Sequence, residues 1–260
     1  MKNFRGKTAL ITGASSGIGE ACAKILAAHG CNLIIVARRE ERLKILKDEL
    51  EEDCKIRVDV MSHDLSSQAG CDELMKETDK LTYPVDILIN NAGFNYTGNF
   101  VEQNWKKQHE MMRLNIDAVT YLSRMYGNKM VKNGSGYMLL VSSIGGYIPC
   151  PDIAIYDASK AYVMLLGEAM AYELKRKNVK VTVLCPGATK TEFFDVAGQI
   201  LNPLVKATMM SAHDTAKCGL IGLSKGKPNI IPGLINKLTA FSLRFTPRSW
   251  MTLLARRVMS

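Results

Sequence analysis

Residues 8–30 hold the sequence feature that most limits what this chain can fold into. Thr8–Thr12 is a short apolar run typical of a buried strand, and the glycine-rich turn Gly13–Gly19 follows it. A helical stretch, Glu20–His29, comes directly after the turn. Strand, glycine turn and helix in this order predict the first unit of an α/β fold, with an anion-binding site where the helix begins.

The turn has the spacing Gly-x-x-x-Gly-x-Gly. Glycines let a pyrophosphate approach the backbone, and the free N–H groups at a helix N-terminus attract its negative charge. An ordinary βα turn is the structural alternative, but such a turn rarely needs three glycines. We therefore expect a dinucleotide here, in contact with Gly13, Ser15, Ser16, Gly17, Ile18 and Gly19.

A second apolar run, Asn32–Ala37, ends in Arg38 and Arg39. In a dinucleotide-binding fold the end of this strand meets the adenosine ribose, where an acidic residue suits NAD and an arginine suits the 2′-phosphate of NADP. Arg38 and Arg39, with Ser15 and Ser16 nearby, therefore favour NADP(H) over NAD(H). The alternative is a solvated basic turn before the charged stretch that follows.

Four more strand-like runs alternate with helical stretches along the chain. They are Lys55–Val60, Val85–Ile89, Tyr137–Ser143 and Val179–Leu184. This alternation predicts an α/β fold with a Rossmann-type doubly wound parallel sheet of about seven strands, in three α/β/α layers. A chain of 260 residues, 47% of them apolar, is long enough to bury one such core.

Polar and small residues follow the ends of these strands, where parallel sheets bind ligands. Asp64 and Leu65 follow the third strand, and Asp64 suits either the adenine amino group or a helix cap. Asn91, Ala92 and Gly93 follow the fourth strand, where small residues let the backbone pass close to a ligand.

Tyr156 and Lys160 are spaced so that a helix places both side chains on one face. A nearby ammonium favours the phenolate, so we expect Lys160 to lower the pKa of Tyr156 and make it a usable proton donor. Ser143 ends the fifth strand thirteen residues earlier, and strand alternation turns its neighbour Ser142 to the other face. Asn115 lies within a helical stretch, where asparagine is mildly unfavourable. Each residue also has a purely structural alternative. Ser143 would then be a turn serine, Asn115 a buried amide and Tyr156 a packed aromatic.

Together these motifs resemble the short-chain dehydrogenase/reductase family. The matching segments are Thr12-Gly13-x-x-x-Gly17-Ile18-Gly19, Asn90-Asn91-Ala92-Gly93, Asn115, Ser143, Tyr156-x-x-x-Lys160 and Pro186-Gly187-x-x-x-Thr191. They occur in the family's order and cover about residues 5–225. The resemblance implies an NADP(H)-dependent oxidoreductase that interconverts a carbonyl and an alcohol.

The resemblance also implies a role for each residue of the site. Tyr156 would exchange a proton with the carbonyl oxygen, and Lys160 would lower its pKa and hold the nicotinamide ribose. Ser143 would orient the carbonyl, and Asn115 would hold a water that links Lys160 to solvent. The nicotinamide end would be supported by Pro186, Gly187, Thr189 and Thr191.

The stretch of about residues 189–210 is expected to close over the substrate and is apolar. Its large apolar residues are Phe193, Phe194, Val196, Ile200, Leu201, Leu204 and Val205. Further walls are expected from Phe94, Tyr147 and Cys150. This lining favours a 3-oxoacyl or other lipophilic ketone. The alternatives are a hydroxysteroid or 3-hydroxy acid dehydrogenase, and a non-catalytic NADP(H)-sensing protein attached through its tail.

The net charge of +9 is concentrated near the C-terminus, because residues 215–260 contain eight basic residues and no acidic one. We expect a catalytic domain over 1–226 and a basic helical extension of the same domain over 227–260. Its two helical stretches, broken at Pro247, carry the apolar residues Leu234, Ile235, Leu238, Phe241, Phe245, Trp250, Leu253, Leu254 and Val258. This pattern favours a subunit interface or a cover over the substrate channel, ahead of contact with an anionic membrane. Nucleic acid is not expected. The tail resembles that of a bacterial branch described as DltE-like or ketoacyl-reductase-like.

The N-terminal sequence and the cysteines indicate a cytoplasmic protein. Because of the basic tail, a peripheral membrane location is a second possibility. The N-terminus has no signal-like apolar segment, and the seven cysteines are scattered without a Cys-x-x-Cys pair. The four histidines are isolated, so no metal site is expected. A homodimer or homotetramer is expected, since folds of this kind commonly associate through their helices.

Overall fold

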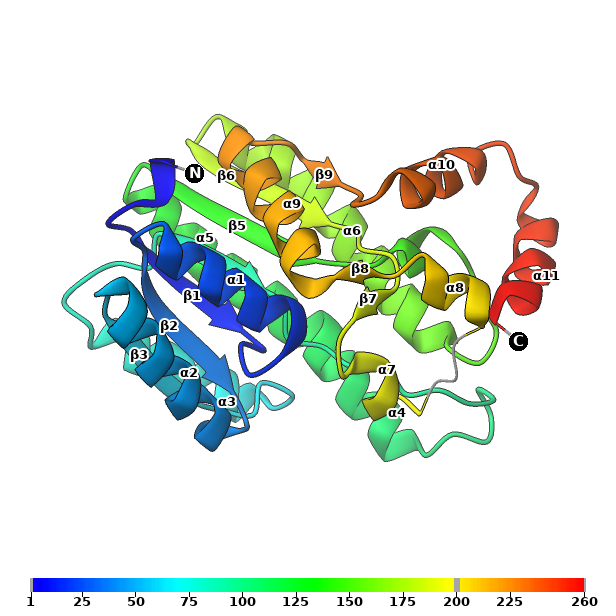
Figure 1. Ribbon diagram of the computed structural model, residues 1–260, viewed down its shortest axis with the longest axis horizontal. Coiled ribbons are helices and arrows are strands. Elements are labelled where there is room, and N and C mark those ends of the chain that lie inside the picture. The colour runs from blue at the N-terminus through cyan, green and yellow to red at the C-terminus, as the bar shows by residue number, and fades with distance from the viewer. Residues whose placement is uncertain (1, 199–201, 260) are drawn as a thin grey trace.

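The computed structural model describes residues 2–198 and 202–259. Within these residues, seven strands form one central sheet in the order β3-β2-β1-β4-β5-β6-β9, and every neighbouring pair is parallel. Helices cover both faces of the sheet (Figure 1). The prediction of a doubly wound parallel sheet of about seven strands is confirmed.

The strands of the central sheet are β1 (Thr8–Thr12), β2 (Asn32–Ala37), β3 (Val58–Ser62), β4 (Ile87–Asn90), β5 (Gly136–Val141), β6 (Val179–Leu184) and β9 (Asn229–Ile230). A separate parallel pair consists of β7 (Thr189–Lys190) and β8 (Met210–Ser211). The α-helices are α1 (Gly17–Ala28), α2 (Glu40–Cys54), α3 (Gln68–Asp79), α4 (Trp105–Met112), α5 (Val119–Lys132), α6 (Ala154–Lys175), α7 (Phe193–Val196), α8 (Pro203–Ala207), α9 (Ala212–Lys225), α10 (Leu234–Ser242) and α11 (Arg248–Met259). Three other helical turns are η1 (Lys2–Phe4), the π-helical η2 (Arg113–Ala118) and η3 (Ile144–Tyr147).

Side-chain alternation along the strands divides the core into two parts. Ala9 and Ile11 of β1 belong to the apolar cluster that includes residues of α1, α2 and α9. Leu10 belongs to the cluster on the other face, with residues of α3, α5 and α6. Such near-continuous apolar strands are expected in a parallel sheet that is covered on both faces.

One boundary near β3 differs from the expected one. β3 begins at Val58 rather than Lys55, because α2 continues to Cys54 and Lys55 ends that helix with a φ of 55°. Strand propensity alone does not include this helix end. The next helix, α3, begins after Ser67, whose side chain accepts a hydrogen bond from the backbone N–H of Gly70.

The stretch after residue 226 first adds a strand to the central sheet and then forms two helices. β9 pairs with β6 as the seventh strand, and α10 and α11 then lie at one end of the molecule (Figure 1). In the described part of the chain, every helix is too short or too polar to cross a bilayer.

Candidate active site

Four adjacent strands bring the candidate residues to one edge of the sheet. β1, β4, β5 and β6 are neighbours and run in the same direction, so their carboxyl ends lie side by side. Gly13, Asn91, Ser142 and Pro186 follow these four ends. Residues that lie up to 173 positions apart in the sequence, Gly13 and Pro186, therefore meet in one place, which is where open α/β sheets bind their ligands.

The glycine turn between β1 and α1 forms a tight backbone cradle. Gly13 and Gly17 have φ values of 66° and 60°, in the left-handed region that favours glycine. A Cβ on Gly19 would collide with the carbonyl oxygen of Gly13, and one on Gly17 would lie 2.9 Å from the methyl carbon of Thr191. Asn91 Nδ2 donates to the carbonyl oxygen of Gly13 at 3.2 Å, which fixes the turn to β4.

The N-terminus of α1 points its backbone donors at this cradle. Ser16 is the N-cap residue, and its side chain makes no capping hydrogen bond. The first N–H groups of the helix are thus left for an anion, which the helix dipole also favours. The glycine cradle and these donors fit the pyrophosphate of a dinucleotide.

The two arginines after β2 take different positions. Arg39 donates to Ser16 Oγ at 2.9 Å and to Ser15 Oγ at 3.0 Å, so its guanidinium lies beside the glycine turn. Arg38 instead pairs with Glu110 of α4 at 3.2 Å, and its side chain is 60% exposed. The structure therefore brings Arg39, and not Arg38, together with both serines.

Glu192, just after β7, contacts the same basic group. Its carboxylate lies 3.0 Å from Arg39 Nη1 and 2.8 Å from Arg42 Nη1. Hydrogen bonds from Arg42 and then Arg39 lower the pKa of Glu192. Sequence reasoning missed Arg42 and Glu192, because 150 residues separate them and neither belongs to a motif. The pairs join the turn at the end of β2 to the segment that follows β6.

Tyr156 and Lys160 lie on the buried side of the first turns of α6. Lys160 Nζ donates to the carbonyl oxygen of Val141 at 3.0 Å and lies 5.6 Å from the centroid of the Tyr156 ring. The Ser143 side chain lies near enough to the Tyr156 phenol to lower its pKa. The end of β5 and the start of α6 thus bring Ser143, Tyr156 and Lys160 together.

Burial dominates the electrostatics of this group. It raises the pKa of Tyr156 above its ordinary value, and the nearby Ser143 side chain opposes that shift only in part. It also lowers the pKa of Lys160 to about 8. The expected lowering of the Tyr156 pKa by Lys160 is therefore not found among the groups of this chain. Both charged forms lose solvation, and this loss is the largest cause of each shift.

Asn115 lies in the π-helical turn η2 and is fully buried. Its Nδ2 donates to the carbonyl oxygen of Phe94 at 3.0 Å and to Ser159 Oγ at 3.1 Å, and its Oδ1 accepts from the N–H of Phe94 at 3.2 Å. A Cβ on Gly93 would lie 2.9 Å from this Oδ1 and 3.3 Å from Lys160 Nζ. The amide thus fixes the chain after β4 against α6, with room only for glycine. π-turns of this kind are frequent at functional sites.

The neighbouring serines at the end of β5 face different partners. Ser142 Oγ donates to the carbonyl oxygen of Lys160 at 2.6 Å and is buried. Ser143 Oγ accepts from the N–H of Gly145 at 3.0 Å, and the same side chain lies near the Tyr156 phenol. Ser142 therefore anchors α6 to the strand, and Ser143 alone of the two reaches the phenol.

The loop after β6 is held from two sides. The carbonyl oxygen of Pro186 accepts from the N–H of Ile144 at 2.8 Å, and Thr189 Oγ1 donates to the carbonyl oxygen of Gly187 at 3.0 Å. The side chain of Asn236 from α10 lies against Gly187, where a Cβ would collide with it. Asn236 carried no sequence signal, since the contact depends on how α10 packs.

Asp64 and Leu65 are placed by local structure. Asp64 Oδ1 accepts from the N–H of Ser66 at 3.0 Å and from Ser66 Oγ at 2.8 Å. Leu65 is buried in the core on the α3 side of the sheet. Asp64 therefore makes a local turn contact ahead of α3, whose cap is Ser67, and the adenine contact of Asp64 stays a prediction.

Apolar side chains surround Tyr156. Cys150 is buried in the same cluster, and Phe94 and Phe193 pack against it. The rings of Tyr156 and Phe193 lie 5.6 Å apart, and Phe194 packs edge-on against Phe193. Tyr147 lies elsewhere. It packs with Met164, Val183 and Cys185, and its hydroxyl accepts a hydrogen bond from Asn229.

Part of the expected substrate segment cannot be placed. Ile200 and Leu201 lie outside the described residues, and the side chains of Val196 and Leu204 are not described. Ala255 of α11 also belongs to the Tyr156 cluster, and sequence reasoning missed it.

Asp157, next to Tyr156, is a buried carboxyl group. Its Oδ2 accepts from the N–H of Cys150 at 3.0 Å, while no group of the described residues hydrogen-bonds Oδ1. Burial raises the pKa of Asp157 to about 7. Sequence reasoning missed it because an acidic residue in the first turn of a helix is ordinarily a solvated one.

The chain is similar to known oxidoreductases. A family model described as short chain dehydrogenase matches residues 7–199. The oxidoreductase UcpA of Salmonella typhimurium is 33% identical over 208 residues, which are 78% of this chain and 77% of that protein.

Two solved structures are also similar. A short-chain dehydrogenase from Sphingobium yanoikuyae in complex with NADPH is 30% identical, with a TM-score of 0.83, over 91% of this chain and 92% of that one. The bulky-bulky ketone specific alcohol dehydrogenase from Comamonas testosteroni is 31% identical, with a TM-score of 0.77, over 92% of this chain and 93% of that one.

Proposed function

Since this chain belongs to the short-chain dehydrogenase family of oxidoreductases, we propose that it interconverts a carbonyl and an alcohol on a lipophilic substrate with NADP(H). The observation that carries the proposal is the group formed by Ser143, Tyr156 and Lys160, at the sheet edge that also holds the glycine cradle. A proton donor, a positive charge and a phosphate site thus occupy one edge.

The residues present fit a nicotinamide dinucleotide. The cradle of Gly13, Gly17 and Gly19 leaves no room for side chains, and the N-terminus of α1 would hold the pyrophosphate. Lys160 would hold the nicotinamide ribose, and Gly93 leaves space beside it. When bound, the cofactor supplies or accepts a hydride at the substrate carbon.

The chain's own residues then manage the proton and the orientation of the substrate. Tyr156 donates its phenolic proton to the carbonyl oxygen during reduction and takes it back during oxidation. The Lys160 ammonium stabilises the resulting phenolate. Ser143, which lies beside the phenol, donates to the same carbonyl oxygen and aligns it. Asn115 holds Phe94 and Ser159 in register behind the group, and we retain for it the role of holding a water near Lys160.

A preference for NADP(H) is supported by Arg39. A guanidinium beside two serine hydroxyls at the end of β2 is a suitable site for a 2′-phosphate. Arg42 adds a second positive charge nearby. The similar Sphingobium enzyme was solved with NADPH, which agrees with this assignment.

A lipophilic carbonyl substrate, a 3-oxoacyl compound or another ketone, is supported by the apolar surroundings of Tyr156. Phe94, Cys150 and Phe193 offer no charged group to a substrate. The Comamonas relative is described as specific for bulky-bulky ketones. We further propose a homo-oligomer, since Leu165 and Tyr172 of α6 are 63% and 82% exposed, and a reducing, cytoplasmic setting, since the cysteines are free.

The proposal is tested by incubating the purified protein with NADPH or NADH and a panel of ketones, while absorbance of the reduced cofactor is followed. We expect turnover of at least one lipophilic ketone and a higher kcat/KM with NADPH. Tight NADPH binding without turnover of any carbonyl would support a cofactor-sensing protein instead. A strong preference for NADH would contradict the assignment of Arg39.

A further inference from the structure

Helix α10 turns its apolar side toward solvent. Ile235, Leu238 and Phe241 on the helix, and Phe245 just after it, have side chains between 57% and 75% exposed. Their spacing of three or four residues places them on one side of the helix. Within α10, all of which is described, Ala240 alone is buried. A helix that covered its own core would turn its large apolar residues inward and its small ones outward.

Helix α11 repeats this arrangement and also reaches the candidate active site. Its Ala255 packs in the Tyr156 cluster, and Met251 is buried. Trp250 and Leu253, by contrast, are 63% and 67% exposed. The inner side of α11 therefore covers the site, while its outer side is apolar and uncovered by the described residues. The side chains of Leu254, Arg257 and Val258 are not described.

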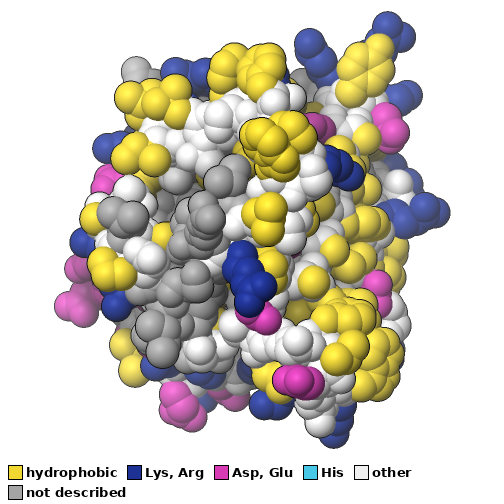
Figure 2. Space-filling model, turned by 90° about the vertical axis from the view of Figure 1, so that its right-hand side faces the viewer, with side chains coloured by type: hydrophobic (Ala, Val, Ile, Leu, Met, Phe, Trp, Pro, Cys, Tyr) yellow, Lys and Arg dark blue, Asp and Glu magenta, His cyan; other side chains and the backbone are white. Residues whose placement is uncertain are grey.

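Basic side chains border this apolar surface. Lys237, Arg244, Arg248 and Arg256 are exposed, and none of them forms an ion pair with a carboxylate in the described part of the chain. Figure 2 looks onto the end of the molecule where α11 lies and shows hydrophobic groups with Lys and Arg among them. Because residues 215–260 contain no acidic residue, α10 and α11 supply no negative charge of their own to balance these basic side chains.

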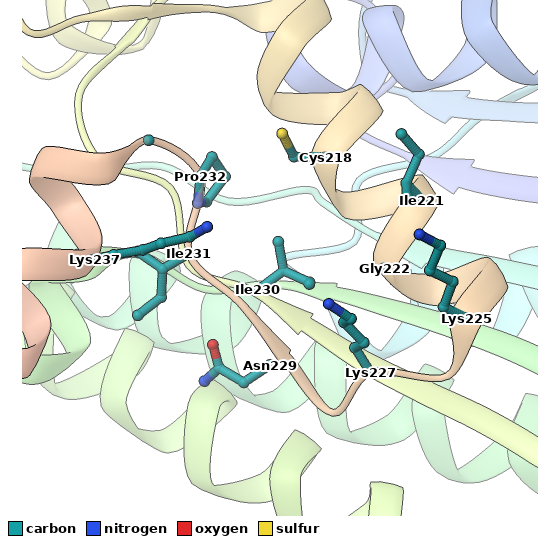
Figure 3. A pocket seen from close by; sticks show the side chains of 11 residues that line it. Cys218, Ile221, Gly222, Lys225, Lys227, Asn229, Ile230, Ile231, Pro232 and Lys237 are labelled. Carbon is teal, nitrogen blue, oxygen red and sulfur yellow. The ribbon is translucent and has the colours of Figure 1, made fainter.

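A hollow of about 320 Å³ adjoins α10 and carries the same combination of groups. Lys225 at the end of α9, Lys227 before β9 and Lys237 of α10 line it, together with the apolar side chains of Ile221 and Ile230 (Figure 3). Three ammonium groups around an apolar floor suit an anionic headgroup that is attached to an apolar tail.

We propose that α10 and α11, with the adjoining hollow, form a docking face for the surface of an anionic lipid bilayer. Exposed Leu, Phe and Trp side chains would enter the boundary between headgroups and acyl chains, and the basic residues would bind the headgroups. Docking places the α11 cover of the Tyr156 cluster at the lipid surface, from which a lipophilic substrate would enter. The docking itself requires no catalysis, so it stands or falls apart from the proposed reaction.

A second copy of this chain is the main rival occupant. In a twofold dimer through this face, the same patch would meet itself. Basic residues would then face basic residues, with no acidic side chain from α10 or α11 of either copy between them. An anionic bilayer satisfies both the apolar and the positive parts of the surface.

The test is co-sedimentation of the full chain with vesicles of phosphatidylcholine, alone or mixed with phosphatidylglycerol. We expect binding to the anionic vesicles, weaker binding at high salt, and binding to pure phosphatidylcholine at least tenfold weaker. The double variant Lys237→Glu/Arg244→Glu should bind about 25-fold more weakly or worse, at roughly fivefold for each basic residue near the surface.

Matched variants separate the docking face from general effects. Phe245→Ser removes an apolar side chain that is 75% exposed, and Ile45→Ser on α2 removes one that is 68% exposed. Only the first should weaken vesicle binding, by about tenfold. Lys175→Glu/Lys177→Glu reverses two exposed charges at the far end of α6 and should have a much smaller effect than reversal on α10.

Three results would overturn the proposal. One is no binding to anionic vesicles, and another is equal loss with Phe245→Ser and Ile45→Ser. The third is a dimer, measured by light scattering without vesicles, that Phe245→Ser dissociates while vesicle binding stays absent. Turnover of a water-soluble ketone, measured without vesicles, reports on the proposed function separately.

Discussion

Among single residues, burial has the largest effect on the charges around the candidate site. Tyr156, Asp157 and Lys160 lie within five consecutive positions and are all at least nine-tenths buried. Burial raises the pKa of the first two and lowers the pKa of Lys160 to about 8. Burial therefore favours the uncharged form of all three side chains, which suits a site that transfers a proton.

Asp157→Asn should make folding stability less dependent on pH. The pKa of Asp157 is raised to about 7 in the folded chain, so its contribution to stability is complete below its unfolded pKa and is lost as the pH rises to about 7. Asparagine does not ionise. The difference in unfolding free energy, variant minus wild type, should therefore rise by about 2–3 kcal/mol between pH 5 and pH 8.

Urea unfolding at both pH values measures this gap, with Asp53→Asn, an exposed carboxylate on α2, as the control. Titrations shared by both proteins cancel in the difference. A gap that is the same at pH 5 and pH 8 would show that Asp157 titrates as an ordinary surface carboxyl does.

Gly93→Ala should lower activity while the protein stays folded. The added methyl group would lie 2.9 Å from Asn115 Oδ1 and 3.3 Å from Lys160 Nζ, so it would displace the ammonium from its place near Tyr156. We expect kcat to fall by about tenfold to a hundredfold, since small misplacements of catalytic groups cost this much. Steady-state kinetics and circular dichroism together check it, and unchanged kcat would mean that Lys160 tolerates the shift.

At the scale of elements, the segment after β6 connects the two halves of the site. Thr191 packs on the glycine turn, and Glu192 contacts Arg39 and Arg42 at the expected 2′-phosphate position. A carboxylate and a 2′-phosphate would compete for the same guanidinium groups. On the proposed preference for NADP(H), one side chain would thereby link cofactor binding to the position of the segment after β6.

Glu192→Gln should strengthen binding of NADPH and of 2′,5′-ADP, because it removes the competing charge. Exposed ion pairs contribute little, about 1 kcal/mol or less, so a gain of about threefold to fivefold is expected. NADH binding, which involves no 2′-phosphate, serves as the internal control. Fluorescence titration measures all three ligands, and an equal gain for NADH would argue against direct competition.

The elements also show how far the sequence alone leads. The strands, the glycine turn and the spacing of Ser143, Tyr156 and Lys160 depend on neighbours near in sequence, and these allowed the fold and the family to be predicted. The position of Glu192, the contact of Asn236 with Gly187 and the direction of the Tyr147 ring depend on packing between distant elements. The outward apolar side of α10 is of the same kind, since periodicity defines a stripe and not the direction in which it points.

On the scale of the whole molecule, the C-terminal end completes a site that the N-terminal end begins. α10 lies against Gly187 through Asn236, and α11 reaches the Tyr156 cluster through Ala255. The last helices therefore pack on the candidate site, although the family motifs end well before them. Substrate size should accordingly be sensitive to residues near the C-terminus.

Ala255→Phe should raise KM for bulky ketones by about tenfold and leave small ketones nearly unaffected. Ala255 is 7% exposed within the Tyr156 cluster, so a larger side chain would take up space next to the phenol. Thr252→Phe, at an exposed position of the same helix, is the matched control. Equal effects of both variants would place the substrate away from α11.

The most direct test of the central claim is the Tyr156→Phe variant. The change removes one hydroxyl group and keeps the ring in its apolar cluster, so the fold and the glycine cradle should be preserved. We predict that kcat for ketone reduction falls at least a thousandfold, while the Kd for NADPH, measured by fluorescence titration, stays within about twofold. Turnover near the wild-type rate with NADPH still bound would contradict the assignment of Tyr156 as the proton donor.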